Sequence, residues 1–122
     1  MGKAIRILLV EDEVILSMTM KEQIKSIGYS IAQSVPTGEK AIAAAKSDPP
    51  DLIFMDIRLA GEIDGIDAAI SIKSESDIPV IFITGYDDKT IRERAEKTDP
   101  LAFLIKPAKM SVLKEIIDSL FV

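Results

Sequence analysis

The stretch DLIFMDIRLAGEIDGI, residues 51–66, decides the fold. It begins with an apolar run at residues 52–55, which is followed directly by Asp56 and then by a loop that contains Gly61 and Gly65. A short, uninterrupted apolar run suits a strand that is buried on both faces of a sheet. The stretch therefore predicts a buried strand that carries a carboxylate at its C-terminal end.

Similar runs recur on both sides of this stretch, at residues 5–10, 30–35, 80–83 and 102–105. Helical patterns alternate with these runs. The first predicted helix ends at Gly28, the second covers residues 38–46 and the third begins near residue 64 or 65. The fourth covers residues 88–97, and the fifth fills the C-terminal segment. The apolar residues that we expect on their buried faces are Leu16, Met20, Ile24, Ile27, Ala41, Ile42, Ala45, Ile66, Ala69, Ile70, Met110, Leu113, Ile116, Ile117 and Leu120.

Five alternations of strand and helix predict an α/β fold with a parallel sheet and helices on both of its faces. We expect a doubly wound (βα)5 domain, a flavodoxin-like three-layer sandwich with strand order 2-1-3-4-5. The length of 122 residues suits one domain, residues 1–122. In such sheets, ligands bind outside the carboxyl ends of the strands.

Composition excludes several classes of function. The chain contains no His and no Cys, which excludes Ser-His-Asp catalysis, thiolate metal sites and a phosphohistidine donor. Its formal net charge of −5 disfavours nucleic-acid binding, which needs basic patches. No apolar run approaches the roughly 20 residues that span a bilayer, so we expect no membrane contact and a cytoplasmic location. No DNA-binding segment follows Val122, which suits either a stand-alone protein or a domain cut from a longer one.

Polar side chains follow four of the five predicted strands. Glu11, Asp12 and Glu13 follow the first, Asp56 the third, Thr84 ends the fourth and Lys106-Pro107 follows the fifth. At one edge of the sheet the carboxylates would repel one another by about 4 kcal/mol per pair at 4 Å, with an effective dielectric constant near 20. A hard cation such as Mg²⁺ offsets this repulsion. Taken singly, each of these residues could serve only as a helix cap or as a surface cation.

The stretches ILLVEDE, DLIFMDIRLAGEIDGI, PVIFITGY and AFLIKP resemble, in their order and spacing, the receiver domains of response regulators. The resemblance covers the whole chain. It implies a signalling switch of a two-component system and not an enzyme: a histidine kinase or a phosphotransfer protein would donate a phosphoryl group from phosphohistidine, and Mg²⁺ would be the cofactor.

The resemblance also implies a role for each matching residue. Asp56 would be the phosphoacceptor, Asp12 would bind Mg²⁺ directly and Glu11 would assist through water, and the backbone carbonyl of Arg58 would complete the metal site. Thr84 and Lys106 would contact the phosphoryl oxygens. Phe103 would turn inward on activation and change the face between the fourth and fifth helices, which would bind an output partner or a second copy. Lys106-Pro107 would be a cis peptide.

Three other functions fit parts of this pattern. A haloacid-dehalogenase-like phosphatase also uses an Asp, a Thr, a Lys and Mg²⁺, but it needs a second acid where this chain has Arg58. A flavodoxin-like cofactor binder needs a Ser/Thr/Gly-rich turn after the first strand, and this turn is Glu-Asp-Glu. A degenerate receiver would lack some of the chemical residues, which are all present here.

The sequence departs from the usual receiver pattern at four places. Ala60 stands where Pro is common, and the loop at residues 59–65 is one residue longer. Asp99-Pro100 replaces a frequent Gly-Ala pair, and Ala108 replaces a typical Phe. These changes leave the phosphorylation chemistry untouched but affect the face formed by the fourth and fifth helices.

Overall fold

The computed structural model describes residues 4–85 and 87–121. Tyr86, the last residue of the PVIFITGY stretch, lies outside the described residues. The strands are β1 (Arg6–Val10), β2 (Ser30–Val35), β3 (Leu52–Met55), β4 (Val80–Thr84) and β5 (Ala102–Ile105). The helices are α1 (Val14–Ser26), α2 (Gly38–Ser47), α3 (Gly65–Lys73), α4 (Lys89–Glu96) and α5 (Met110–Phe121).

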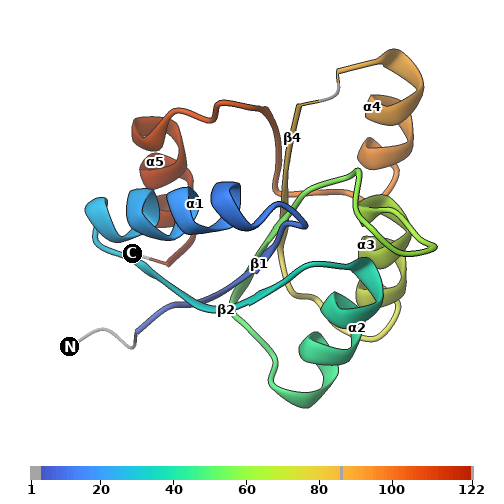
Figure 1. Cartoon of the computed structure of the whole chain (residues 1–122), viewed down its shortest axis with the longest axis horizontal. Coiled ribbons are helices and arrows are strands. Elements are labelled where there is room, and N and C mark those ends of the chain that lie inside the picture. Colours follow the sequence, from blue (N-terminus) through green and yellow to red (C-terminus); the bar gives the residue numbers. More distant parts are fainter. Residues whose placement is uncertain (1–3, 86, 122) are drawn as a thin grey trace.

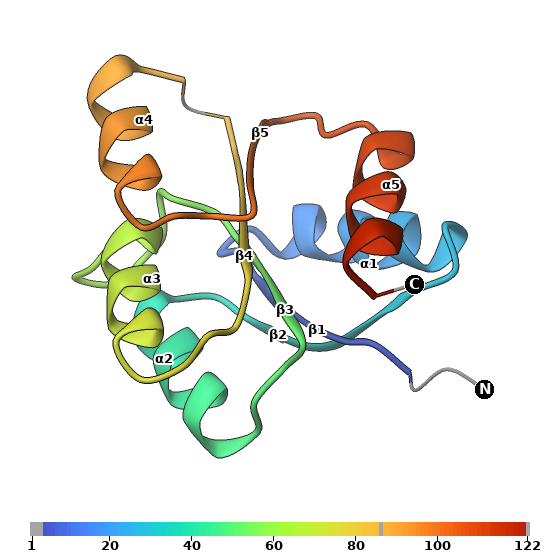
Figure 2. The ribbon, with the colours of Figure 1, turned by 180° about the vertical axis from the view of Figure 1, so that it is seen from behind.

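The five strands form one parallel sheet in the order β2-β1-β3-β4-β5, which confirms the predicted topology. Helices α1 and α5 lie on one face of the sheet, and α2, α3 and α4 lie on the other (Figures 1 and 2). The chain therefore folds as the three-layer sandwich expected from its alternating pattern. No described helix has both the length and the apolar character needed to cross a membrane.

The core lies in two layers, one on each side of the sheet. Alternate residues of β1 supply the two layers: Leu8 and Val10 face α2 and α3, whereas Ile7 and Leu9 face α1 and α5. Residues of β3 alternate in the same way, and all four of them are buried. Burial on both faces explains why these strands read as continuous apolar runs rather than as alternating ones.

Capping side chains fix where the helices begin. The side chains of Thr37, Asp64 and Asp88 accept hydrogen bonds from the backbone at the starts of α2, α3 and α4. At the end of α1, Gly28 adopts a φ of +94°, as predicted for a glycine that terminates a helix. Predicted and observed boundaries differ by one residue at most for the strands and for α2 and α4.

Three residues that were predicted on buried helix faces are exposed. Ile70 of α3 retains 55% of its accessible surface, Leu120 of α5 retains 40% and Leu16 of α1 retains 38%. In α1, Ser17 is buried instead, on the same face as Ile24 about two turns further along the helix. The prediction failed here because several faces of these helices carry apolar residues, so that spacing alone does not identify the buried face.

Candidate functional site

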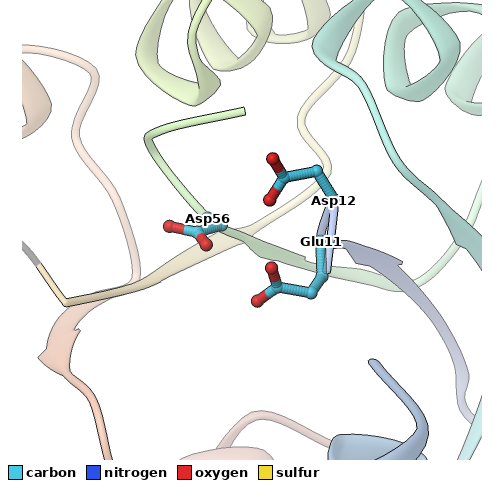
Figure 3. Close-up of side chains that lie close together, drawn as sticks. All are labelled: Glu11, Asp12 and Asp56. Atoms are coloured by element: carbon cyan, nitrogen blue, oxygen red, sulfur yellow. The ribbon is translucent and has the colours of Figure 1, made fainter. Parts of the chain in front are cut away.

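The site lies at the carboxyl ends of β1 and β3, where neighbouring parallel strands bring their following residues together. Glu11 and Asp12 come directly after β1, and Asp56 comes directly after β3. The backbone continues the sheet at this point, because the Asp56 N–H donates to the carbonyl of Val10 at 3.0 Å. Figure 3 shows the three carboxylates pointing toward a common space.

The three carboxylates form a compact acidic cluster. One oxygen from each of Glu11, Asp12 and Asp56 lies within 4.8 Å of the others. Glu11 and Asp56 are buried, and Asp12 is the most exposed of the three. Carboxylate oxygens in this arrangement suit a hard divalent cation, and their mutual repulsion is relieved when one binds. The residues therefore fit a Mg²⁺ ion.

Lys106 neutralises part of this cluster. Its Nζ atom donates to Glu11 Oε1 at 2.6 Å and to Asp56 Oδ2 at 2.8 Å. Burial alone would lower the pKa of Lys106, but the hydrogen bonds to both carboxylates raise it above its ordinary value, so the side chain stays cationic. The pKa of Glu11 is raised, mainly because burial disfavours the charged form. The peptide bond between Lys106 and Pro107 is cis, as predicted.

Backbone N–H groups hold the two buried carboxylates in place. The N–H of Ile57 donates to Asp56 Oδ1 at 2.7 Å, and the N–H of Glu13 donates to Glu11 Oε2 at 3.1 Å. With Lys106 on Oδ2, both oxygens of Asp56 have a donor. The Asp56 carboxylate is thus held in one orientation by a hydrogen bond on each oxygen.

Gly65, which the sequence analysis did not assign to the site, lies directly against the backbone of Asp56. A Cβ atom at Gly65 would lie 1.9 Å from the backbone oxygen of Asp56, so that no other residue fits without a shift of the chain. The Gly65 N–H also donates to the carbonyl of Ile57 at 2.7 Å, which closes the base of the β3–α3 loop. The signal in the sequence was a glycine directly after the capping Asp64.

The cluster opens into a cleft of about 540 Å³. Its lining includes the acidic pair Asp12 and Asp56 together with Arg58, Gly85 and Lys106. The structure thus brings Lys106 to the same place as the acidic residues, as predicted from its position after β5, and Arg58 lines the same cleft.

The two residues predicted to form the switch lie on neighbouring strands. Thr84 ends β4 and is completely buried, and its carbonyl accepts the Lys106 N–H at 2.8 Å. Phe103 lies in β5, where its ring centroid is 6.3 Å from that of Phe82. The guanidinium of Arg92 covers the Phe103 ring, a contact that the sequence analysis did not anticipate.

Comparison with known proteins agrees with this geometry. The family model of the response regulator receiver domain matches residues 7–118. The transcriptional regulatory protein PdtaR of Mycobacterium tuberculosis is 34% identical over 108 residues, which is 88% of this chain and 52% of that protein. The chain thus spans about half the length of this relative.

Two further relatives match over nearly their whole length. The chemotaxis protein CheY of Thermotoga maritima is 30% identical over 119 residues, or 97% of each chain. The crystal structure of the signal receiver domain of a modulated diguanylate cyclase from Desulfovibrio desulfuricans superposes with a TM-score of 0.88 at 31% identity, covering 96% of this chain and 93% of that one. The chain therefore belongs to the response regulator receiver domain family, the signalling domains of two-component systems.

Proposed function

We propose that this receiver domain, residues 1–122, accepts a phosphoryl group on Asp56 from the phosphohistidine of a histidine kinase or a phosphotransfer protein, with Mg²⁺ as cofactor. The observation that carries this proposal is the arrangement around Asp56: a buried, hydrogen-bonded carboxylate at the mouth of a cleft, beside two further carboxylates and one ammonium group. In this role the domain promotes only its own phosphorylation and dephosphorylation and acts on no separate substrate.

The proposed reaction transfers one phosphoryl group between two side chains. An oxygen of the Asp56 carboxylate attacks phosphorus, an acyl phosphate bond forms and the bond from phosphorus to the imidazole nitrogen of the donor breaks. The electron pair stays on that nitrogen, which leaves a neutral imidazole. A carboxylate nucleophile needs no general base, which suits a chain without His. The site would then contribute to catalysis by aligning the two reacting groups and by placing positive charge close to the phosphoryl oxygens.

We assign the metal to Asp12 and Asp56, with Glu11 assisting through water and the backbone carbonyl of Arg58 completing the protein ligands. When bound, Mg²⁺ supplies positive charge opposite the phosphoryl oxygens. Lys106, which now binds Glu11 and Asp56, would hold one phosphoryl oxygen by the same ammonium group.

The signal would leave the site through Thr84 and Phe103. The Thr84 hydroxyl would donate to a second phosphoryl oxygen, and its movement would let Phe103 turn further inward. Because Phe103 lies between α4 and the sheet, this movement changes the face formed by α4, β5 and α5. An output partner or a second copy of the chain would bind there. We place the domain in the cytoplasm, where it would meet such a phosphoryl donor.

Phosphorylation can be tested with a small donor. Incubation with acetyl phosphate and Mg²⁺ should add the mass of one phosphoryl group to the intact protein, and Asp56→Asn should abolish this addition. Asp77→Asn is a suitable control, because Asp77 is exposed and lies outside the cleft. Full modification of the Asp56→Asn variant under the same conditions would rule out Asp56 as the acceptor.

A further inference from the structure

The β3–α3 loop is held at its tip as well as at its base. Residues 58–64 leave the sheet after Asp56 and return at Gly65, whose N–H donates to the Ile57 carbonyl at 2.7 Å. The residues of this loop that line the phosphorylation cleft are Arg58, Leu59 and Ala60. The position of these residues, and of the Arg58 carbonyl assigned to the metal, therefore depends on how the rest of the loop is anchored.

The start of α2 provides this anchor. Thr37, which caps α2, forms an isolated parallel bridge with Ala60. The side chain of Ile63 packs closely over Gly38, where an added Cβ atom would lie 2.9 Å from Ile63 Cγ1. Three consecutive residues at the start of α2, the third being Glu39, thus contact the loop in turn.

The Glu39 side chain forms a hydrogen bond with the loop backbone. Within the described part of the chain, it is the one side chain at the start of α2 that does so. Its Oε2 atom accepts the N–H of Glu62 at 2.9 Å. At Gly61, with a φ of +97°, an added Cβ atom would lie 2.6 Å from Glu39 Oε1, so the carboxylate lies directly against the loop. The hydrogen bond from the Glu62 N–H also lowers the pKa of Glu39, which keeps the acceptor ionised at neutral pH.

We infer that Glu39 is a positioning residue for the metal and phosphorylation site. It touches neither the metal nor the phosphoryl group. Instead, it holds the loop of residues 58–64 so that Arg58, Leu59 and Ala60 line the same cleft as Asp12 and Asp56. This inference rests on the proposed function, because it gives Glu39 a role in assembling that same site.

The prediction is a loss of Mg²⁺ affinity without loss of the fold. In Glu39→Ala, the dissociation constant for Mg²⁺ should rise roughly threefold to tenfold. The effect should be smaller than the 10- to 100-fold typical of a direct partner of a metal ligand, because the contact is exposed to water. In Glu39→Gln the amide oxygen can still accept the Glu62 N–H, so Mg²⁺ affinity should stay within about twofold of the wild type.

Backbone NMR of the full chain can test this inference in two ways. In the metal-free protein, the Glu62 amide should exchange with solvent faster in Glu39→Ala than in the wild type and in Glu39→Gln. A Mg²⁺ titration of the same samples then gives the three dissociation constants. Glu22→Ala is the charge-matched control, because Glu22 is exposed on α1 and lies away from the loop.

Each outcome of this experiment is decisive. Unchanged exchange and unchanged affinity in Glu39→Ala would overturn the inference while leaving the proposed function intact. Equal loss of affinity in Glu39→Gln and Glu39→Ala would also overturn it, since charge and not position would then be the cause. No Mg²⁺ response in the wild type would overturn both the proposed metal site and the role of Glu39 in it.

Discussion

The guanidinium carbon of Arg92 lies 4.6 Å from the centroid of the Phe103 ring, so that a cation on α4 covers the aromatic side chain on β5. The same guanidinium is held by Asp87, with Oδ1 accepting from Nη2 at 2.9 Å and from Nε at 3.1 Å. Asp87 belongs to the segment between β4 and α4, downstream of Thr84. The segment that follows Thr84 is therefore connected to Phe103 through one arginine.

We expect a measurable coupling between Arg92 and Phe103. A double-mutant cycle with Arg92→Ala, Phe103→Leu and the double variant should give a coupling free energy of unfolding of about 0.5–1 kcal/mol, as for a partly exposed cation–π contact. Urea unfolding measures the four free energies. Arg92→Lys keeps the charge but loses the planar stack, so it should lose part of this stabilisation. A coupling near zero would mean that the contact adds nothing to stability.

Removing the most exposed carboxylate of the site should separate metal binding from stability. Asp12→Asn should weaken Mg²⁺ binding but raise the metal-free free energy of unfolding by roughly 1 kcal/mol, because it relieves repulsion from Glu11 and Asp56. Thermal melts with and without Mg²⁺ measure both effects, since the ion stabilises the state that binds it. Asp77→Asn should show neither effect. A variant that melts lower without metal and keeps the full Mg²⁺ response would disprove the carboxylate cluster.

The ion pairs between α4 and α3 should make stability depend on acidic pH. Arg94 donates to Asp64 Oδ2 at 2.8 Å and to Asp67 Oδ1 at 3.3 Å. Burial alone would raise the pKa of Asp64, but the hydrogen bonds from Arg94 and from the Asp67 N–H lower it below its ordinary 3.8. A lowered pKa in the folded state contributes stability above the unfolded pKa, and this stability is lost as the pH falls through the folded value.

Arg94→Ala should therefore reduce the free energy of unfolding by about 1 kcal/mol at pH 7, a modest effect because Arg94 is 42% exposed and screened by water. The difference from the wild type should shrink as the pH falls from 3.8 through the lower pKa that Asp64 has in the folded protein. Denaturant unfolding at a series of pH values measures it. Lys21→Ala, which removes an exposed cation on α1, should show no such trend. A difference that stays constant to low pH would exclude Asp64 as the partner.

Thr84→Ala should uncouple phosphorylation from its readout. The variant should still gain phosphate, because Asp56, Lys106, Glu11 and Asp12 are unchanged. The conformational change should not reach Phe103. Backbone NMR shifts of residues 84–110, recorded with and without beryllofluoride as a phosphoryl mimic, measure this transmission. Identical mimic-induced shifts around Phe103 in Thr84→Ala and in the wild type would disprove the coupling, although Asp56 could still be the acceptor.

The sequence predicted the strands well because burial on both faces leaves little choice of residue. All four residues of β3 are apolar and buried, so the run at 52–55 could be read directly. The parallel sheet followed from the alternation of elements, and the order β2-β1-β3-β4-β5 places β1 beside β3, so that Glu11, Asp12 and Asp56 meet. The polar residues at strand ends could be read in the same way, because the topology alone brings them to one edge.

The contacts between loops and helices could not be predicted in this way. The hydrogen bond between Glu39 and Glu62 joins two exposed acidic residues, which carry no apolar periodicity. Arg92 and Phe103 meet through the packing of α4 on β5, which spacing along the chain does not encode. Asp99 is a further case, because it adopts a φ of +54° while Lys73 Nζ donates to its carbonyl at 2.6 Å, and only the structure shows this contact.

The close contact between Gly65 and the backbone carbonyl of Asp56 limits how this protein can be redesigned. An engineer who wishes to alter phosphoryl lifetime or donor preference can randomise Leu59 and Ala60, which line the cleft, while the base of their loop stays fixed. Gly65 must be excluded from any such library, because a side chain there would run into the Asp56 carbonyl. The exchangeable part of the loop is thus its cleft wall, whereas Asp64, which caps α3 and pairs with Arg94, stays unchanged together with Gly65.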